Sequence, residues 1–97
     1  MTGKYLTDAE GTLIVPDAAT LTRLDISGRT DVRALPALPA ALVVYANRCV
    51  SLTRLDLPAA TTVYAAGCTA LTSIDLPSAK IVDVHGCPAL VGIRWLI

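Results

Sequence analysis

The sequence predicts an all-β fold, a short leucine-rich-repeat-like β-solenoid with coils of about 19 residues, two short strands per coil and little or no helix. Cys49, Cys68 and Cys87 are spaced 19 residues apart, and leucine or isoleucine and proline positions recur at the same offset. The six prolines would break any helix of useful length. The segments between them are rich in Val, Ile, Thr and Tyr, which favour strands.

The domain organisation follows from the length and from where the repeat is regular. A chain of 97 residues can form one small domain, and the ends of a solenoid have to differ from its middle. We expect four parts: an N-terminal lead-in or cap over 1–12, an irregular first coil over 13–37, regular coils over 38–89 and a partial C-terminal coil over 90–97.

The first coil is expected to be longer and less regular than the later ones. The segment LTRLDI (21–26) closely matches LTRLDL (52–57), which places Asp25 in the context of the aspartates of the later leucine strands. Between these segments the leucine positions slip against the repeat, and Val32 and Leu35 are the expected stand-ins.

Each regular coil contains two related apolar patterns. The first is L-x-x-L-x-L (71–76), and the second is A-x-x-V-x-A-x-x-C (60–68). The end of each pattern alternates between apolar and polar residues, as a half-buried strand does. Proline after the first strand and glycine before the cysteine suit corners between strands. Stacked coils would then form inner ladders of Leu or Ile, Val, Ala and Cys.

The regular part resembles a known repeat family. The segments GCTALTSIDLPSA (67–79), RCVSLTRLDLPAA (48–60) and GCPALVGI (86–93) are similar to the cysteine-type leucine-rich repeats of the BspA-like class. The chain departs from that class in its shorter unit and in lacking the Ala-Phe pair before the cysteine, which implies a flatter, more compact coil. The resemblance implies binding or adhesion and not catalysis.

Composition excludes several classes of partner. Apolar residues make up 54% of the chain and charged residues 16%, so disorder is not expected. Eight basic and eight acidic residues cancel, which leaves no electrostatic footprint for nucleic acid or an anionic membrane. The N-terminus lacks a secretory pattern, and no apolar run reaches the roughly 20 residues of a membrane span. Taken as complete from its Met, the chain is expected to be cytoplasmic or assembled intracellularly, including in a virion.

The cysteines and aspartates are interpreted as structural. A zinc site needs about four ligands with close pairs, and the nearest approach to one is His85-Gly-Cys87. We expect buried thiols, with one disulfide or a metal as alternatives. Asp56 and Asp75 share an outward column followed by Arg94, which indicates a solvated, charge-paired face and not acid–base or calcium chemistry. No catalytic motif is present, so no enzyme, cofactor or metal is predicted.

The candidate interaction residues lie on the outward face of the repeat and at the point where the repeat ends. Tyr45 and Tyr64 share an outward column, and either stack only for stability or form a recognition stripe. An apolar C-terminus replaces the polar cap of a solitary solenoid. It either folds over the last coil or associates with another chain. The candidate residues are Tyr45, Tyr64, Asn47, Arg48, His85, Trp95, Leu96 and Ile97.

The favoured function is a non-catalytic protein–protein interaction module whose partner is an unidentified protein. The alternative is a structural or assembly subunit, for example a viral particle component, which associates with further copies through its apolar C-terminal end. The least favoured hypothesis is an enzyme or metal-binding protein that uses the Cys and Asp ladders.

Overall fold

The computed structural model describes residues 5–94, and these form an all-β solenoid without a helix. The described part of the chain therefore contains no helix that could cross a lipid bilayer. The strands are β1 (Leu6–Thr7), β2 (Leu13–Ile14), β3 (Arg23–Asp25), β4 (Val43–Tyr45), β5 (Arg54–Asp56), β6 (Thr62–Tyr64), β7 (Ser73–Asp75), β8 (Ile81–Asp83) and β9 (Gly92–Arg94).

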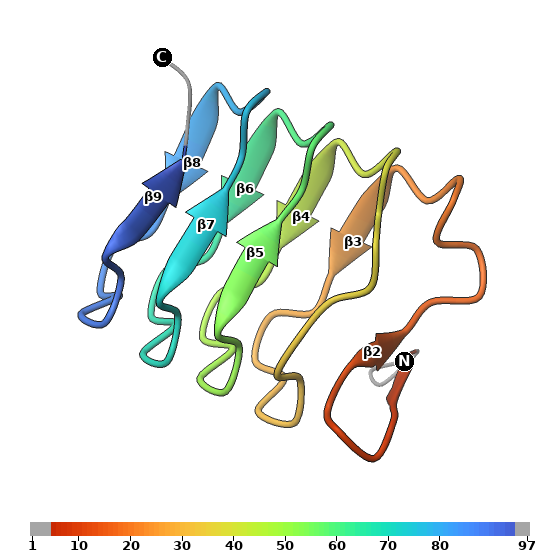
Figure 1. The fold of residues 1–97 in the computed structure, drawn as a ribbon, viewed down its shortest axis with the longest axis horizontal. Helices are drawn as coiled ribbons and strands as arrows, with labels where there is room; N and C mark the ends of the chain where they lie inside the picture. Colours follow the sequence, from red (N-terminus) through yellow and green to blue (C-terminus); the bar gives the residue numbers. More distant parts are fainter. Residues whose placement is uncertain (1–4, 95–97) are drawn as a thin grey trace.

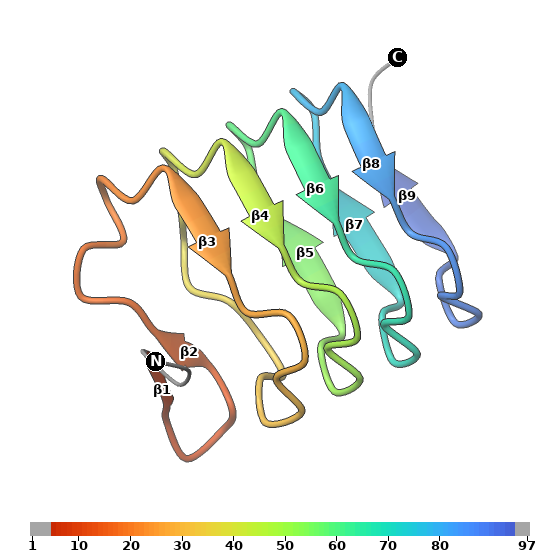
Figure 2. The same ribbon diagram turned by 180° about the vertical axis from the view of Figure 1, so that it is seen from behind.

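The strands form two parallel sheets and one hairpin. Strands β3, β4, β6 and β8 make a four-stranded sheet, β5, β7 and β9 a three-stranded sheet, and β1 pairs with β2 antiparallel. Figure 1 shows the two parallel sheets as two rows of strands, and each regular coil contributes one strand to each row. Figure 2 shows the four-stranded sheet from its own side. The predicted solenoid with two short strands per coil is confirmed.

The register follows the sequence repeat. Val44 pairs with Val63, and Val63 with Val82, at steps of 19 residues. The first step is one residue longer, because Leu24 pairs with Val44. This agrees with the longer first coil expected from the sequence.

The core lies between the two sheets and is built from columns of like residues. The side chains of Val44, Val63, Leu55 and Ile74 are at most 1% exposed. Buried alanines and the buried Cys49 and Cys68 complete the core. A parallel stack brings each inward side chain against its counterparts in the neighbouring coils, so every column contributes to one continuous core.

The last coil is less buried than the repeat predicts. We expected Val82, Cys87, Leu90 and Ile93 inside, but the first three are only partly buried and Ile93 is 54% exposed. Their inward positions are as expected, yet no described coil packs on their C-terminal side. Burial in a solenoid needs a neighbour on both sides of the coil.

The corners after the four-stranded sheet use a left-handed backbone. Gly28, Gly67 and Gly86 have φ between 74° and 82°, and Arg48 occupies the same position with φ 61°. In this conformation the amide at the corner points along the stack. The N–H of Gly67, for instance, donates to the carbonyl of His85 at 2.7 Å. Glycine is favoured there because a Cβ is strained at positive φ.

The segment LTRLD occurs twice and lies in different sheets. Its first copy contains β3, which pairs with β4, and its second copy contains β5 in the opposite sheet. The expectation that Asp25 shares the context of Asp56 is therefore wrong. The corner decides the placement, because Ser27-Gly28 follows the first copy and Pro58 follows the second.

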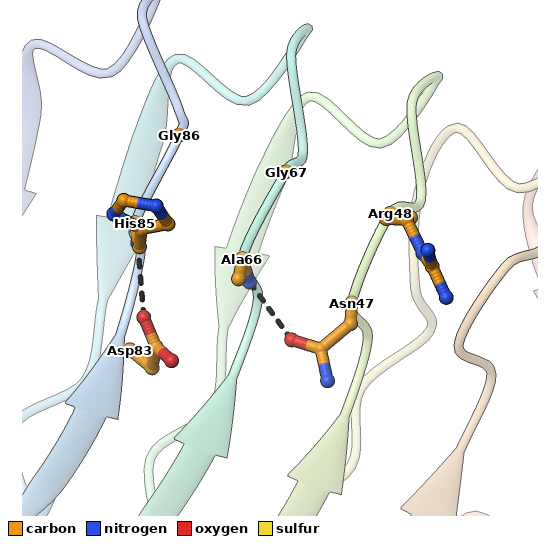
Figure 3. A pocket seen from close by; sticks show the side chains of 7 residues that line it. All are labelled: Asn47, Arg48, Ala66, Gly67, Asp83, His85 and Gly86. Carbon is orange, nitrogen blue, oxygen red and sulfur yellow. Dashed lines mark hydrogen bonds between the residues drawn. The ribbon is translucent and has the colours of Figure 1, made fainter.

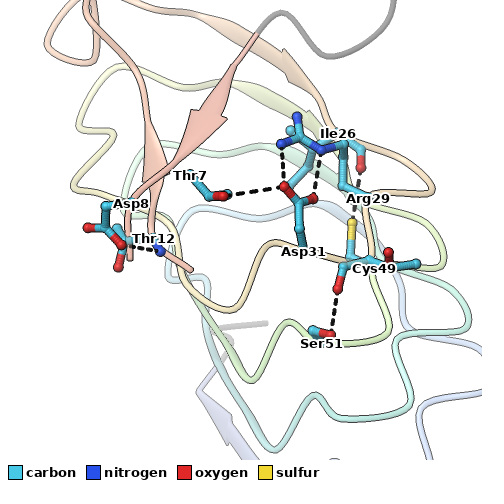
Figure 4. A network of polar contacts seen from close by, with 9 residues as sticks. Thr7, Asp8, Thr12, Ile26, Arg29, Asp31, Cys49 and Ser51 are labelled. Carbon is cyan, nitrogen blue, oxygen red and sulfur yellow. Dashed lines mark hydrogen bonds and ion pairs between the residues drawn. The ribbon is translucent and has the colours of Figure 1, made fainter. Parts of the chain in front are cut away.

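The N-terminal hairpin is held against the first coil by polar contacts. Thr12 forms a parallel bridge with Ala34, and Thr7 donates its hydroxyl to Asp31 at 3.4 Å. Asp31 also accepts two hydrogen bonds from the Arg29 guanidinium, both at 2.8 Å (Figure 4). The N-terminal end of the solenoid is thus closed by a strand pair and a bidentate ion pair.

Candidate interaction face

One outward column of the four-stranded sheet carries two tyrosines with an aspartate on either side. We call it the tyrosine column, and its members are Asp25, Tyr45, Tyr64 and Asp83, paired in that order. The neighbouring Val44 and Val63 point into the core, so strand alternation directs the tyrosine column outward. The two tyrosines were predicted from the sequence, but Asp25 was not, because LTRLDI was assigned to the wrong sheet.

The two tyrosine rings stack on each other. Their centroids are 5.4 Å apart and their planes differ by 6°. Parallel strands lie about 4.8 Å apart, so identical residues in one column are brought to stacking distance by the fold itself. The stack therefore stabilises the sheet, as one of the two interpretations predicted. It also presents two pre-oriented, partly exposed aromatic side chains on the surface.

The N-terminal side of the stack is covered by a cation. The guanidinium carbon of Arg23 lies 5.5 Å from the centroid of the Tyr45 ring, which is within cation–π range. On the C-terminal side Tyr64 is paired with Asp83, and Ile81 occupies the column of Arg23. Within residues 5–94 no cation lies over the ring of Tyr64.

A shallow pocket of about 440 Å³ lies beside the tyrosine column, at the turns that follow β4, β6 and β8. We call it the turn pocket, and it is lined by Asn47, Arg48, Ala66, Gly67, Asp83, His85 and Gly86. Three of the predicted candidates, Asn47, Arg48 and His85, thus meet at one site (Figure 3). The side chain of Arg48 runs toward the preceding coil, away from Asp83 and His85.

Side-chain oxygens at the turn pocket satisfy the backbone amides that the coils leave open. Asn47 Oδ1 accepts the N–H of Ala66 at 2.9 Å, and Asp83 Oδ1 accepts the N–H of His85 at 3.0 Å. Ala66 has no side-chain oxygen that could accept the N–H of His85 in the following coil. The His85 amide therefore donates to Asp83 of its own coil. The second carboxylate oxygen of Asp83 has no partner among the described residues.

The cysteine ladder is structural in its geometry. Each thiol donates to a backbone carbonyl of the preceding coil at 3.0 to 3.1 Å. Burial raises the pKa of the Cys49 thiol to about 11 and also raises the pKa of Cys68. All three cysteines, including the partly exposed Cys87, are free thiols. Buried, hydrogen-bonded thiols with raised pKa values are poor nucleophiles and poor metal ligands.

The aspartate column of the other sheet has the predicted register but different charge pairing. Asp56 pairs with Asp75, and Asp75 with Arg94. The ion pair on this face joins Arg54 and Asp56 at 3.8 Å, and both side chains are exposed. Across residues 5–94 no group of three or more His, Cys, Asp or Glu side chains is placed to hold a metal ion.

The C-terminal end of the described chain presents apolar surface. Strands β8 and β9 have no partner on their outer edges within the described part, and Val91 and Ile93 are 85% and 54% exposed. The predicted candidates Trp95, Leu96 and Ile97 lie outside the described residues.

Comparisons with protein-family models, with curated proteins and with solved structures find no match for this chain. The candidate face is therefore defined by its own geometry.

Proposed function

We propose that the protein is a non-catalytic protein–protein interaction module, related to the BspA-like leucine-rich repeats, that binds through the tyrosine column and the turn pocket. The observation that carries the proposal is the outward Tyr45–Tyr64 stack beside the turn pocket. Tyrosine combines apolar contact area with a hydroxyl and is enriched where proteins meet.

The stack favours binding because it lowers the entropic cost of association. Free side chains at an interface lose about 0.5–1.5 kcal/mol each when they are immobilised. Tyr45 and Tyr64 are already ordered by each other and by Arg23, so less freedom is lost. The short, stacked strands also supply a rigid platform. The buried thiols, by contrast, are unsuited to nucleophilic chemistry.

The proposal is tested by removing the aromatic face without disturbing the strands. The double variant Tyr45→Thr/Tyr64→Thr keeps β-forming residues in both strands. We expect proteins retained by the immobilised wild type to be lost from this variant, and the purified partner to bind at least about tenfold more weakly. The matched control Arg54→Thr/Asp56→Thr changes the outward face of the other sheet and should retain the partner. Undiminished binding by the tyrosine variant would contradict the proposal.

A second candidate function is assembly through the C-terminal end. It is favoured by the unpaired edges of β8 and β9 and by exposed Val91 and Ile93. Unpaired strand edges with apolar side chains readily add strands from another chain. We expect analytical ultracentrifugation to detect oligomers that Val91→Lys/Ile93→Lys converts to monomers. A wild type that stays monomeric across micromolar concentrations excludes this candidate.

A further inference from the structure

We propose that Tyr64 and Asp83 form a docking site for a cationic side chain of the partner, an arginine in particular. This inference rests on the proposed interaction face and specifies the chemistry that it recognises. The site lies at the C-terminal end of the tyrosine column, where the column meets the turn pocket.

The opposite end of the tyrosine column shows the arrangement that such a site would have. There the Arg23 guanidinium lies over the Tyr45 ring, and Tyr45 is paired with Asp25. The cation interacts favourably with the ring face, and Asp25 is the neighbour of Tyr45 in the same column. The chain thus already contains one arginine docked on a tyrosine next to an aspartate.

The C-terminal end repeats the tyrosine and the aspartate but lacks the cation. Tyr64 pairs with Asp83 as Tyr45 pairs with Asp25, while Ile81 stands in the column of Arg23. Among residues 5–94 Asp83 forms no ion pair. A partly buried carboxylate next to an electron-rich ring is therefore left without a compensating charge, and a partner can supply it.

The local geometry favours a planar, multidentate cation. Asp83 Oδ1 is occupied by the N–H of His85, whereas its other oxygen points toward the preceding coil and remains open (Figure 3). Guanidinium can donate to that oxygen while its plane lies on the Tyr64 ring. The turn pocket beside Asp83 has room for the attached side chain.

The arginine that lines the turn pocket does not fill the site. Arg48 lines the turn pocket, but its side chain runs toward the preceding coil and away from Asp83 (Figure 3). His85 is exposed, and it contacts Asp83 through its backbone amide.

The direct test is a titration of the ¹⁵N-labelled protein with the peptide acetyl-Gly-Arg-Gly-amide, followed by NMR. We expect saturable shifts of the amides of Tyr64, Asp83 and His85. The same peptide with citrulline in place of arginine has nearly the same shape without the charge, and should bind at least about tenfold more weakly. Shifts that are absent at millimolar peptide, or equal for both peptides, overturn the proposal.

Variants at the two ends of the column separate the site from general effects. Asp83→Asn keeps an oxygen for the His85 amide but removes the charge. This variant should bind the arginine peptide about tenfold more weakly. Asp75→Asn is the matched control, since Asp75 is a partly buried aspartate in the outward column of the other sheet, and it should leave the affinity unchanged. Arg23→Ala should uncover the Tyr45 end and raise the number of bound peptides from one to two.

The outcomes distinguish this inference from the proposed function. A partner that is lost on Tyr45→Thr/Tyr64→Thr but binds Asp83→Asn with full affinity supports the interaction module and overturns the arginine site. A partner whose binding falls in both variants supports both. The NMR spectrum of each variant shows whether it is still folded. Tyr64→Leu provides a second variant at the site, because it keeps an apolar side chain but removes the aromatic ring.

Discussion

Single residues gain their roles from the column in which they stack. The thiol of Cys68 donates to the carbonyl of Ala46, and Cys49 and Cys87 repeat the same bond in their own coils. A small, weakly polar side chain suits this corner, because it fills the core and still supplies a donor to a buried carbonyl. The ladder of cysteines therefore has a structural cause.

Replacement of a central thiol tests this role. Cys68→Ser places a more polar group in a fully buried position, and its shorter C–O bond lengthens the contact to Ala46. We expect a loss of about 1 kcal/mol in the free energy of unfolding, measured by urea denaturation. Cys87→Ser is the matched control, since Cys87 makes the same bond but is only partly buried. Equal losses in the two variants would contradict the buried ladder.

At the scale of secondary-structure elements, the corners determine the placement of each strand. The left-handed corner uses glycine in three of the four positions along its column and Arg48 in the fourth. Gly67 lies next to Arg48, and a Cβ added to Gly67 would lie 3.1 Å from the Cγ of Arg48. At Gly28 the same addition would meet nothing within 4 Å.

The two glycines therefore separate backbone strain from crowding. Gly28→Ala should lower the free energy of unfolding by about 1 kcal/mol through the positive φ alone. Gly67→Ala carries the same strain and also displaces the Arg48 side chain, so we expect a larger loss of up to about 2 kcal/mol. Thermal or urea unfolding of the two variants provides the comparison. A larger loss at Gly28 would show that the column is assigned incorrectly.

The contact between the first coil and the N-terminal hairpin adds a pH-dependent element. The hydrogen-bonded Arg29 guanidinium lowers the pKa of Asp31 from an ordinary 3.8 to about 2. A depressed carboxyl pKa stabilises the fold above the ordinary value, and this contribution is lost as the pH falls from about 4 through about 2. The Asp31 side chain is 49% exposed, so solvent screening keeps the contribution below about 1 kcal/mol.

The Asp31→Asn variant isolates this contribution. Urea midpoints of wild type and variant should differ at pH 5 and converge at pH 2, while other carboxyl groups affect both proteins alike. A difference that persists unchanged at pH 2 would mean that the Asp31 charge is not its source.

At the scale of the whole molecule, the two ends of the solenoid differ. The hairpin closes the N-terminal end, whereas the last described coil leaves amides without partners. The N–H of Ala65 and that of Gly67 each donate to the next coil at 2.7 Å. The corresponding amides of Val84 and Gly86 have no acceptor within residues 5–94.

Amide hydrogen exchange should report this asymmetry. We expect Val84 and Gly86 to exchange at least about 100-fold faster than Ala65 and Gly67, because interior coils open only with their neighbours. Similar protection of all four amides would show that the C-terminal end is covered, which would favour assembly through that end.

Much of the fold could be predicted because the 19-residue repeat indicates which residues of different coils lie side by side. The spacing of Cys49, Cys68 and Cys87 set the coil length, and the apolar pattern set the inward columns. The stacking of Tyr45 on Tyr64 also followed from the offset alone. The errors occurred where the repeat slips or ends, since periodicity carries no information there.

The sequence by itself determined an all-β solenoid, its 19-residue step and the outward column of two tyrosines, since each follows from periodicity and strand alternation. Only the tertiary structure decided that β3 joins the tyrosine sheet, where Arg23 covers Tyr45 and Asp25 mirrors Asp83. The same segment, LTRLD, serves both sheets, so its location depends on the corner and on the coil packed beside it. Those contacts, which are not local, define the open end of the column where we place the site for a partner's arginine.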